Sequence, residues 1–198
     1  MKNDQPFLTD VETLRSRART HLEKGPVTPT YEGDAQQTIN ILQTVLATEI
    51  VCVLRYTANA ICAIGLASDS VKDEFEQHAK EEQEHMRLVA ERINQLGGTP
   101  NMNPEGLAVR SASQYSNPEG LIEMIRENLI AERIAVEHYR ELIRYFADKD
   151  PTTRVMLEGI LTNEEEHAND MLDLLKAHDG KVNDASAAAH SDGGKRKH

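Results

Sequence analysis

The sequence predicts an all-α protein, built as a four-helix bundle with a long crossover between its second and third helices and an extra N-terminal helix. Three observations support this fold class. Apolar residues recur every three or four positions along four long segments, which is the spacing of one helix face. A capping signal precedes each of these segments. Residues 97–117 are rich in Gly, Pro, Asn and Ser and form a longer connection than adjacent antiparallel helices need.

Length and composition limit the function classes. A chain of 198 residues is most simply one domain with a sizeable core. No apolar run approaches the ~20 residues that a membrane-spanning helix needs, and the polar start lacks the core of a signal peptide. We therefore expect a cytoplasmic protein without a membrane partner. The net charge of −11 should repel nucleic acid and attract cations.

The N-terminal third contains a short helix, a linker and the first bundle helix. Thr9–Glu12 has the pattern of a capping box and opens a helix that runs to about Lys24. Residues 25–34 form a linker, and residues 1–34 are thus separate from the bundle. Asp34 caps a helix to about Ala67, whose inward stripe is Ile39, Leu42, Leu46, Glu49, Val53, Tyr56, Ala60, Ala63 and Ala67.

The other bundle helices follow from similar signals. Ser70 caps the second helix, which ends at Gly97-Gly98. Asn117-Pro118 starts the third helix and Asp150-Pro151 the fourth, each with a proline at the first helical position. The bundle domain is predicted to span residues 35–178. Residues 179–198 are rich in Ala, Ser, Gly and Asp and show no apolar stripe, so we expect a disordered tail.

Two Glu-x-x-His motifs carry most of the functional information. They begin at Glu82 and Glu164, and a three-residue spacing places each carboxylate and its imidazole on one face of a helix. That face is the apolar stripe, where a further lone Glu occurs in each half of the chain. The candidate residues are Glu49, Glu82, His85, Glu132, Glu164 and His167.

Each of these residues alone has an ordinary interpretation. A single Glu on an apolar face is usually a boundary residue, and a buried His is usually a hydrogen-bonded core residue. Six of them in a two-fold pattern indicate instead a dinuclear metal site, because four carboxylates neutralise two divalent cations. Oxygen and imidazole ligands suit iron or manganese, and the sequence leaves that choice open.

With these motifs, residues 36–177 resemble the ferritin-like superfamily, specifically bacterioferritins and Dps-like proteins with a bacterioferritin-type site. The resemblance implies that Glu82 and Glu164 bridge two iron ions. It implies further that Glu49 with His85, and Glu132 with His167, complete the terminal ligands. Tyr56, seven residues after Glu49, matches a tyrosine beside the site in bacterioferritins, although it could be an ordinary core tyrosine.

Two departures from bacterioferritins modify this expectation. The position at which they carry a haem-binding Met is Gln83 here, so haem is not expected. The short fifth helix of the 24-subunit bacterioferritin shell is also missing. The sequence therefore favours a homo-oligomeric 12-subunit shell, with 24 subunits as the alternative.

The resemblance implies iron storage and detoxification, in which O2 or H2O2 oxidises Fe(II) and a hollow oligomer holds the mineral. The alternative is a dimanganese catalase that disproportionates H2O2. A third hypothesis is a structural or DNA-compacting protein, but the three basic residues Lys195–Lys197 on an acidic chain give only weak attraction to DNA, so DNA binding is not expected.

The sequence does not assign a function to His78 or to the two cysteines. His78 lies one turn before Glu82 and could be an auxiliary ligand, a proton shuttle or a hydrogen-bond donor. Cys52 and Cys62 are too far apart along one helix to form a disulfide, and we interpret both as small buried side chains.

Overall fold

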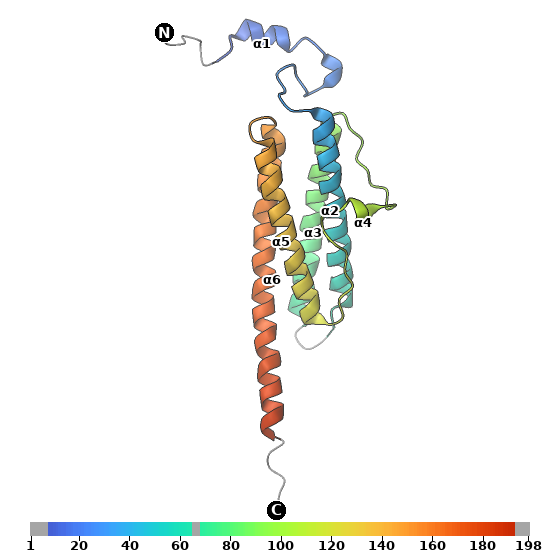
Figure 1. Ribbon diagram of the computed structural model, residues 1–198, viewed down its shortest axis with the longest axis vertical. Coiled ribbons are helices and arrows are strands. Elements are labelled where there is room, and N and C mark those ends of the chain that lie inside the picture. Colours follow the sequence, from blue (N-terminus) through green and yellow to red (C-terminus); the bar gives the residue numbers. More distant parts are fainter. Residues whose placement is uncertain (1–7, 65–67, 193–198) are drawn as a thin grey trace, which may run out of the picture.

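The structure, a computed structural model, describes residues 8–64 and 68–192, with side chains to residue 178. Four long helices form the bundle: α2 (Ala35–Cys62), α3 (Ser68–Gln95), α5 (Leu121–Phe146) and α6 (Pro151–Asp192). Helix α2 packs on α3, and α5 packs on α6 (Figure 1). No strand occurs in the described part of the chain, and the all-α fold class is therefore confirmed.

The crossover between α3 and α5 runs along the outside of α2 and carries a short helix, α4 (Leu107–Arg110) (Figure 1). The side chain of Gln43 holds the start of this segment, because its Nε2 donates to the carbonyl of Thr99 at 2.8 Å and its Oε1 accepts from the amide of Asn101 at 2.9 Å. The predicted crossover between the second and third bundle helices is present, and α4 within it was not predicted.

The N-terminal segment lies across the end of the bundle (Figure 1). The structure divides the predicted helix into α1 (Val11–Arg17) and a 3-10 turn, η1 (Leu22–Lys24). Asp10, rather than Thr9, caps α1, and its carboxylate accepts from the amide of Thr13. The apolar residues of α1 remain exposed, with Val11 at 58%.

Three helix ends agree closely with the sequence signals. Asp34 caps α2 through the amide of Gln37 as predicted, and Asp150 caps α6 in the same way through the amide of Thr153. Helix α3 ends before Gly97, whose φ of +88° suits a glycine at a helix C-terminus. Helix α2 ends at Cys62, five residues before the predicted end near Ala67, because the backbone at Ala63 is extended. Ala67 itself lies outside the described residues.

Other bounds also differ from the prediction. Helix α3 begins at Ser68, so Ser70 lies inside the helix and is not its cap. Helix α5 begins at Leu121 instead of Pro118, because the chain turns into the helix at Gly120, whose φ of +92° other residues rarely adopt. Helix α6 continues to Asp192, where we predicted a disordered tail from residue 179. The alanines at 185 and 187–189 favour helix in this stretch. Residues 193–198 lie outside the described residues.

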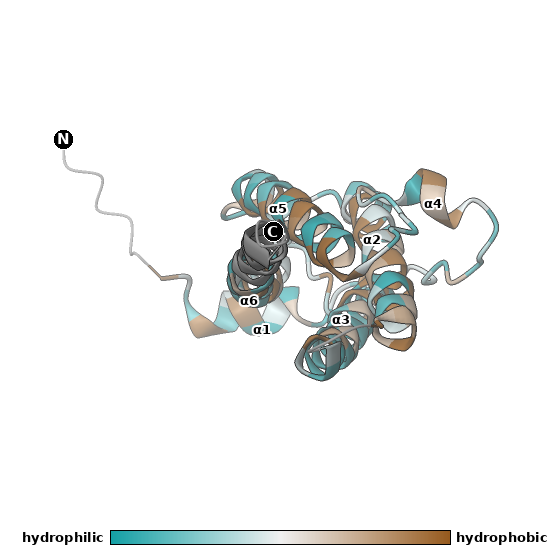
Figure 2. Cartoon of the chain, turned by 90° about the horizontal axis from the view of Figure 1, so that it is seen from below, coloured by the Kyte–Doolittle hydropathy of each residue, from teal (hydrophilic) through white to brown (hydrophobic). Residues whose placement is uncertain are grey.

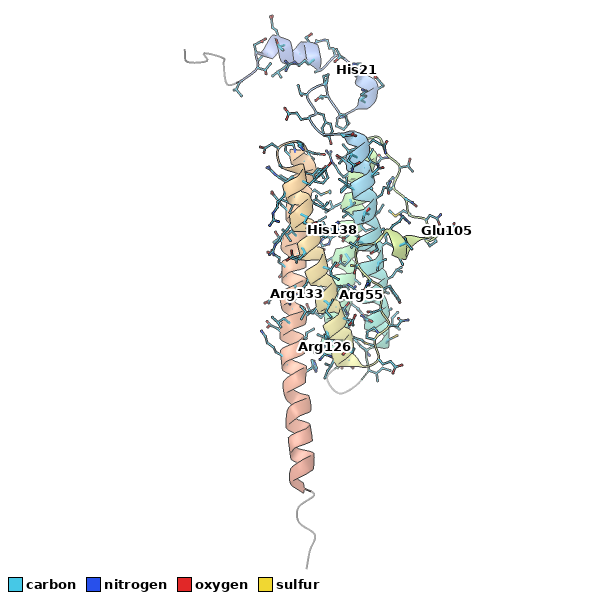
Figure 3. The ribbon with its side chains drawn as sticks, in the orientation of Figure 1. His21, Arg55, Glu105, Arg126, Arg133 and His138 are labelled. Atoms are coloured by element: carbon cyan, nitrogen blue, oxygen red, sulfur yellow. The ribbon has the colours of Figure 1, made fainter. Side chains whose placement is uncertain are left out.

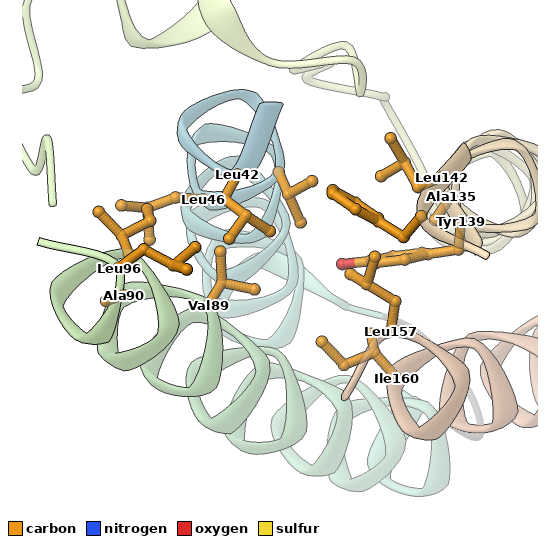
Figure 4. Packing of buried hydrophobic residues seen from close by; sticks show 13 residues of the cluster. Leu42, Leu46, Val89, Ala90, Leu96, Ala135, Tyr139, Leu142, Leu157 and Ile160 are labelled. Carbon is orange, nitrogen blue, oxygen red and sulfur yellow. The ribbon is translucent and has the colours of Figure 1, made fainter. Parts of the chain in front are cut away.

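The core of the bundle contains two large apolar clusters, and a third, small cluster joins Ala47 and Val51 of α2 to Leu107 of α4. Figure 4 shows the cluster nearer the α5–α6 turn, in which Leu42 and Leu46 of α2 face Leu157 and Ile160 of α6. The other cluster includes Tyr56, Phe75, Ile125 and Met171. Figure 2, a view along the bundle, shows hydrophilic residues on the outer sides of the helices.

By length and composition alone, helix α2 could cross a membrane. The sequence analysis did not predict this, because it found no apolar run of sufficient length. In the structure 56% of its apolar window is buried inside the bundle, and the helix also carries the buried charges of Glu49 and Arg55. Its burial and charges explain its composition without a bilayer.

Candidate metal centre

A charged layer separates the two apolar clusters. On each bundle helix the candidate ligands lie between residues of one cluster and residues of the other, as Glu49 lies between Leu46 and Tyr56 on α2. All six are buried, with exposed fractions of 1% for Glu49, 0% for Glu82, 4% for His85, 0% for Glu132, 1% for Glu164 and 1% for His167.

The six residues form two overlapping groups. Glu49, Glu82, His85 and Glu164 make one group, and Glu82, Glu132, Glu164 and His167 make the other. Within each group one ligand atom per residue lies within 4.8 Å of all the others. Glu82 and Glu164 belong to both, which is the position that bridging carboxylates would take.

The polar atoms that face this space have no hydrogen-bond partner. They are buried, and burial without a partner is costly for such groups. The atoms are Glu49 Oε2, both carboxylate oxygens of Glu82 and of Glu164, Glu132 Oε2, and the Nδ1 atoms of His85 and His167. Six oxygens and two imidazole nitrogens that converge in this way fit two divalent cations.

The cluster perturbs its own ionisation. His85 Nδ1 lies 3.2 Å from Glu164 Oε1, 3.4 Å from Glu82 Oε2 and 3.5 Å from Glu49 Oε2. Burial lowers the pKa of His85, but these carboxylates outweigh it and raise the pKa to about 12. Burial also lowers the pKa of His167, but Glu82, Glu132 and Glu81 outweigh it and raise the pKa to about 9.

The carboxylates divide into two kinds. Burial raises the pKa of Glu164 well above its usual value, and the charge of Glu82 adds to the effect. The same two causes raise the pKa of Glu49 to about 7. Burial also acts on Glu82, but its contacts with both histidines hold its pKa well below the usual range. Without metal, protons therefore neutralise the cluster.

Two tyrosines fix the lone glutamates across the bundle. Tyr56 of α2 donates a short hydrogen bond to Glu132 Oε1 on α5. Tyr139 of α5 donates to Glu49 Oε1 on α2 at 2.5 Å. Each bond leaves the second carboxylate oxygen free to face the centre. The structure thus brings the predicted Tyr56 to the site and adds Tyr139.

Glu81 supports the centre from outside. His167 Nε2 donates to Glu81 Oε2 at 2.7 Å, and the Glu81 side chain is 33% exposed. A carboxylate accepts hydrogen bonds, so the contact places the proton on Nε2 and directs Nδ1 toward the centre.

Arg55 is a second residue that the sequence analysis missed. Arg55 is labelled within the bundle in Figure 3. Its side chain is 1% exposed, and Nη2 lies 3.9 Å from Glu132 Oε1. Nε donates to Asn128 Oδ1 at 2.8 Å, and Nη1 donates to Ser113 Oγ at 2.9 Å. The guanidinium therefore ties the crossover to the helix that carries Glu132.

The two cysteines differ from each other. Cys52 is buried beside Arg55, whose Nη2 donates to its sulfur at 3.7 Å, and burial raises the pKa of the thiol well above its usual value. Cys62 is exposed, contrary to our expectation of burial, and neither forms a disulfide within the described residues. Neither cysteine belongs to one of the two ligand groups.

A four-helix bundle with such a carboxylate and histidine layer has the architecture of the dinuclear carboxylate proteins. The family model for the ferritin-like domain matches residues 39–179. The chain therefore belongs to the ferritin-like family, as its motifs predicted.

Three relatives illustrate this membership. The DNA protection during starvation protein of Pyrococcus furiosus is 31% identical over 137 residues, which cover 68% of this chain and 74% of that protein. A dodecameric thioferritin, the bacterioferritin-related protein of Bacteroides fragilis, is 30% identical with a TM-score of 0.73, covering 76% of this chain and 91% of the other. A ferritin-like di-iron carboxylate protein of Bacillus anthracis is 27% identical with a TM-score of 0.63, covering 71% and 96%.

Proposed function

We propose that this protein oxidises Fe(II) at the centre and stores the ferric product as mineral inside a hollow oligomer. One observation carries the proposal: eight buried, unpartnered ligand atoms converge from four helices in two groups that share Glu82 and Glu164. Membership of the ferritin-like family supports iron storage and ferroxidase-type chemistry in general.

In this proposal two Fe(II) ions are the substrate. Glu82 and Glu164 lie between them, Glu49 with His85 holds one, and Glu132 with His167 holds the other. The four carboxylates offset the charge of two divalent ions. The tyrosine hydrogen bonds keep the lone glutamates oriented while the ligand set adjusts.

The oxidant receives one electron from each Fe(II). With O2 as acceptor, two electrons and two protons give H2O2, and with H2O2 as acceptor, two electrons and two protons give two molecules of water. Imidazole and carboxyl protons displaced when Fe(II) binds are a local source for both balances. Both O2 and H2O2 are therefore compatible with the proposed reaction.

We propose a 12-subunit shell in the cytoplasm. One bundle has no cavity for mineral, and the bacterioferritin-related protein of Bacteroides fragilis is a dodecamer. Twelve chains of 22.1 kDa give roughly 265 kDa, which closed point-group symmetry allows. Native mass spectrometry should find this mass. A mass near that of 24 chains would favour the bacterioferritin shell, and a small oligomer would contradict storage.

The dimanganese catalase is the alternative because it uses an equivalent ligand set. The matching family and the three relatives named above are not manganese catalases and give it no support. DNA binding stays outside the proposal, although one relative is named for DNA protection, because the net charge is −11.

The test is Fe(II) oxidation by Glu82→Ala, with Glu84→Ala as the matched control. Both variants remove one carboxylate from α3, but Glu84 is exposed and pairs with Arg87. We expect Glu82→Ala to lose rapid oxidation while its assembled mass is unchanged, and Glu84→Ala to keep the wild-type rate. A wild-type rate in an assembled Glu82→Ala shell would overturn the proposal.

A further inference from the structure

A second cluster of ligand-type side chains lies beside the dinuclear centre, between α3 and α6. These helices lie on the same side of the bundle (Figure 2). The cluster consists of Glu74 and His78 from α3 and Asp170 from α6. His78 is 1% exposed, whereas the two carboxylate side chains are each 36% exposed, so the cluster connects the core to solvent.

The spacing of the three donors suits one small cation. His78 Nε2 lies 3.2 Å from Glu74 Oε1 and 3.6 Å from Asp170 Oδ2. Ligands bound at about 2.1 Å from one metal ion lie roughly 3.0 to 3.5 Å from each other in octahedral or tetrahedral geometry. The side chains therefore need little rearrangement to share an ion.

The imidazole is held in place by ring contacts instead of hydrogen bonds. The His78 ring stacks on the His167 ring with a centroid distance of 4.0 Å, and Tyr56 meets it edge-on at 5.1 Å. Its Nδ1 is buried without a hydrogen-bond partner. A buried imidazole that has no polar partner in the core and is directed at two carboxylates is difficult to explain by packing alone.

The carboxylates also lack a cationic partner. Among the ion pairs of the described residues, neither Glu74 nor Asp170 pairs with Lys or Arg. Burial raises the pKa of Glu74, and the charges of Asp170 and Glu81 raise it further. The cluster thus concentrates negative charge that a cation would relieve.

We propose that Glu74, His78 and Asp170 form a mononuclear site for a divalent cation of the Fe(II), Mn(II) or Zn(II) class, separate from the dinuclear centre. Two carboxylates and one imidazole are ligands that these ions accept. The site shares no ligand with the two groups of the dinuclear centre.

The site is connected to the centre by one further group. His78, Glu81 and His167 also offer ligand atoms within 4.8 Å of one another. A cation at Glu74 and Asp170 can therefore pass Glu81 to reach the buried His167. This loading role rests on the proposed function, whereas the site itself does not.

Crystals of the assembled protein in Zn(II) test the site through the anomalous signal of zinc. We expect a peak about 2.1 Å from His78 Nε2, between the two carboxylates. The double variant Glu74→Gln/Asp170→Asn should lose this peak and keep the dinuclear peaks. The double variant Asp73→Asn/Glu76→Gln removes the same charge from exposed positions of α3 and should keep all of them.

The outcomes separate the two proposals. Filled dinuclear sites without a wild-type peak at His78, or an unchanged peak in Glu74→Gln/Asp170→Asn, would overturn the further site. A peak at His78 beside an empty dinuclear centre would support the further site and overturn the proposed function. For the loading role, we expect Glu74→Gln/Asp170→Asn to slow oxidation of limiting Fe(II) several-fold relative to Asp73→Asn/Glu76→Gln, and equal rates would refute that role.

Discussion

Replacing Tyr139 by Phe removes one hydroxyl and leaves the ring that packs in the core. The hydroxyl donates to Glu49 Oε1 at 2.5 Å, and both residues are 1% exposed. Glu49 Oε2 already lacks a hydrogen-bond partner in the protein, so the variant leaves the carboxylate without a hydrogen bond and with only the charge of His85 at 3.5 Å. A buried hydrogen bond to a charged group contributes about 1.5–3 kcal/mol.

We therefore expect Tyr139→Phe to destabilise the metal-free protein by about 2 kcal/mol at pH 8. For a chain of this size that lowers the melting temperature by roughly 4–8 °C. The pH matters because Glu49 has a raised pKa of about 7, so its carboxylate is ionised at pH 8 and protonated at pH 5.5. The hydrogen bond from tyrosine favours the ionised form, and the difference between variant and wild type should shrink at the lower pH.

Thermal melts followed by circular dichroism, at matched protein concentration and scan rate, measure the effect. Tyr145→Phe is the control, because Tyr145 is 46% exposed and its ring packs against Phe146. A melting temperature of Tyr139→Phe equal to that of Tyr145→Phe at pH 8 would refute the reasoning, as would a loss that is larger at pH 5.5.

Two other predictions concern charge in the same layer. The raised pKa values of His85 and His167, about 12 and about 9, keep both imidazoles protonated at pH 7. Zn(II) binding should therefore release about two or more protons per chain, and the affinity for Zn(II) should rise with pH. Calorimetry in buffers of different ionisation enthalpy measures the protons released, and release of fewer than one proton would contradict the prediction. Arg55→Met should destabilise the protein by roughly 3–5 kcal/mol, because it leaves Glu132 without its buried cation. The control Arg133→Met, at an exposed position of α5, should change the free energy of unfolding in denaturant little. Similar free energies of unfolding for the two variants would show that Arg55 does not stabilise the protein.

The ligand layer could be predicted because helix periodicity is a local property. A Glu and a His three positions apart share a face in any helix, and the stripe in which Glu82 and His85 occur had to face the core. The fold class followed in the same way, and the family match confirms it. Assignment of the six residues as metal ligands remains a prediction that the variants above test.

The supporting contacts were harder to predict, because they join residues far apart in sequence. Arg55 meets Asn128 and Ser113 only after the crossover is placed, and no spacing rule links them. Glu81 is off the apolar stripe of its own helix and reaches His167 from the side. Tyr139 could have been found, since it follows Glu132 by the same seven residues that separate Tyr56 from Glu49.

That repeated spacing explains why the centre is symmetric beyond its ligands. In each half of the chain a lone Glu and a Tyr two turns later lie on one helix, and each Tyr crosses to the Glu of the other half. The two hydrogen bonds join α2 to α5. These helices belong to different pairs, since the most extensive packing is between α2 and α3 and between α5 and α6. The charged layer therefore links the two helix pairs directly, through one hydrogen bond in each direction between α2 and α5.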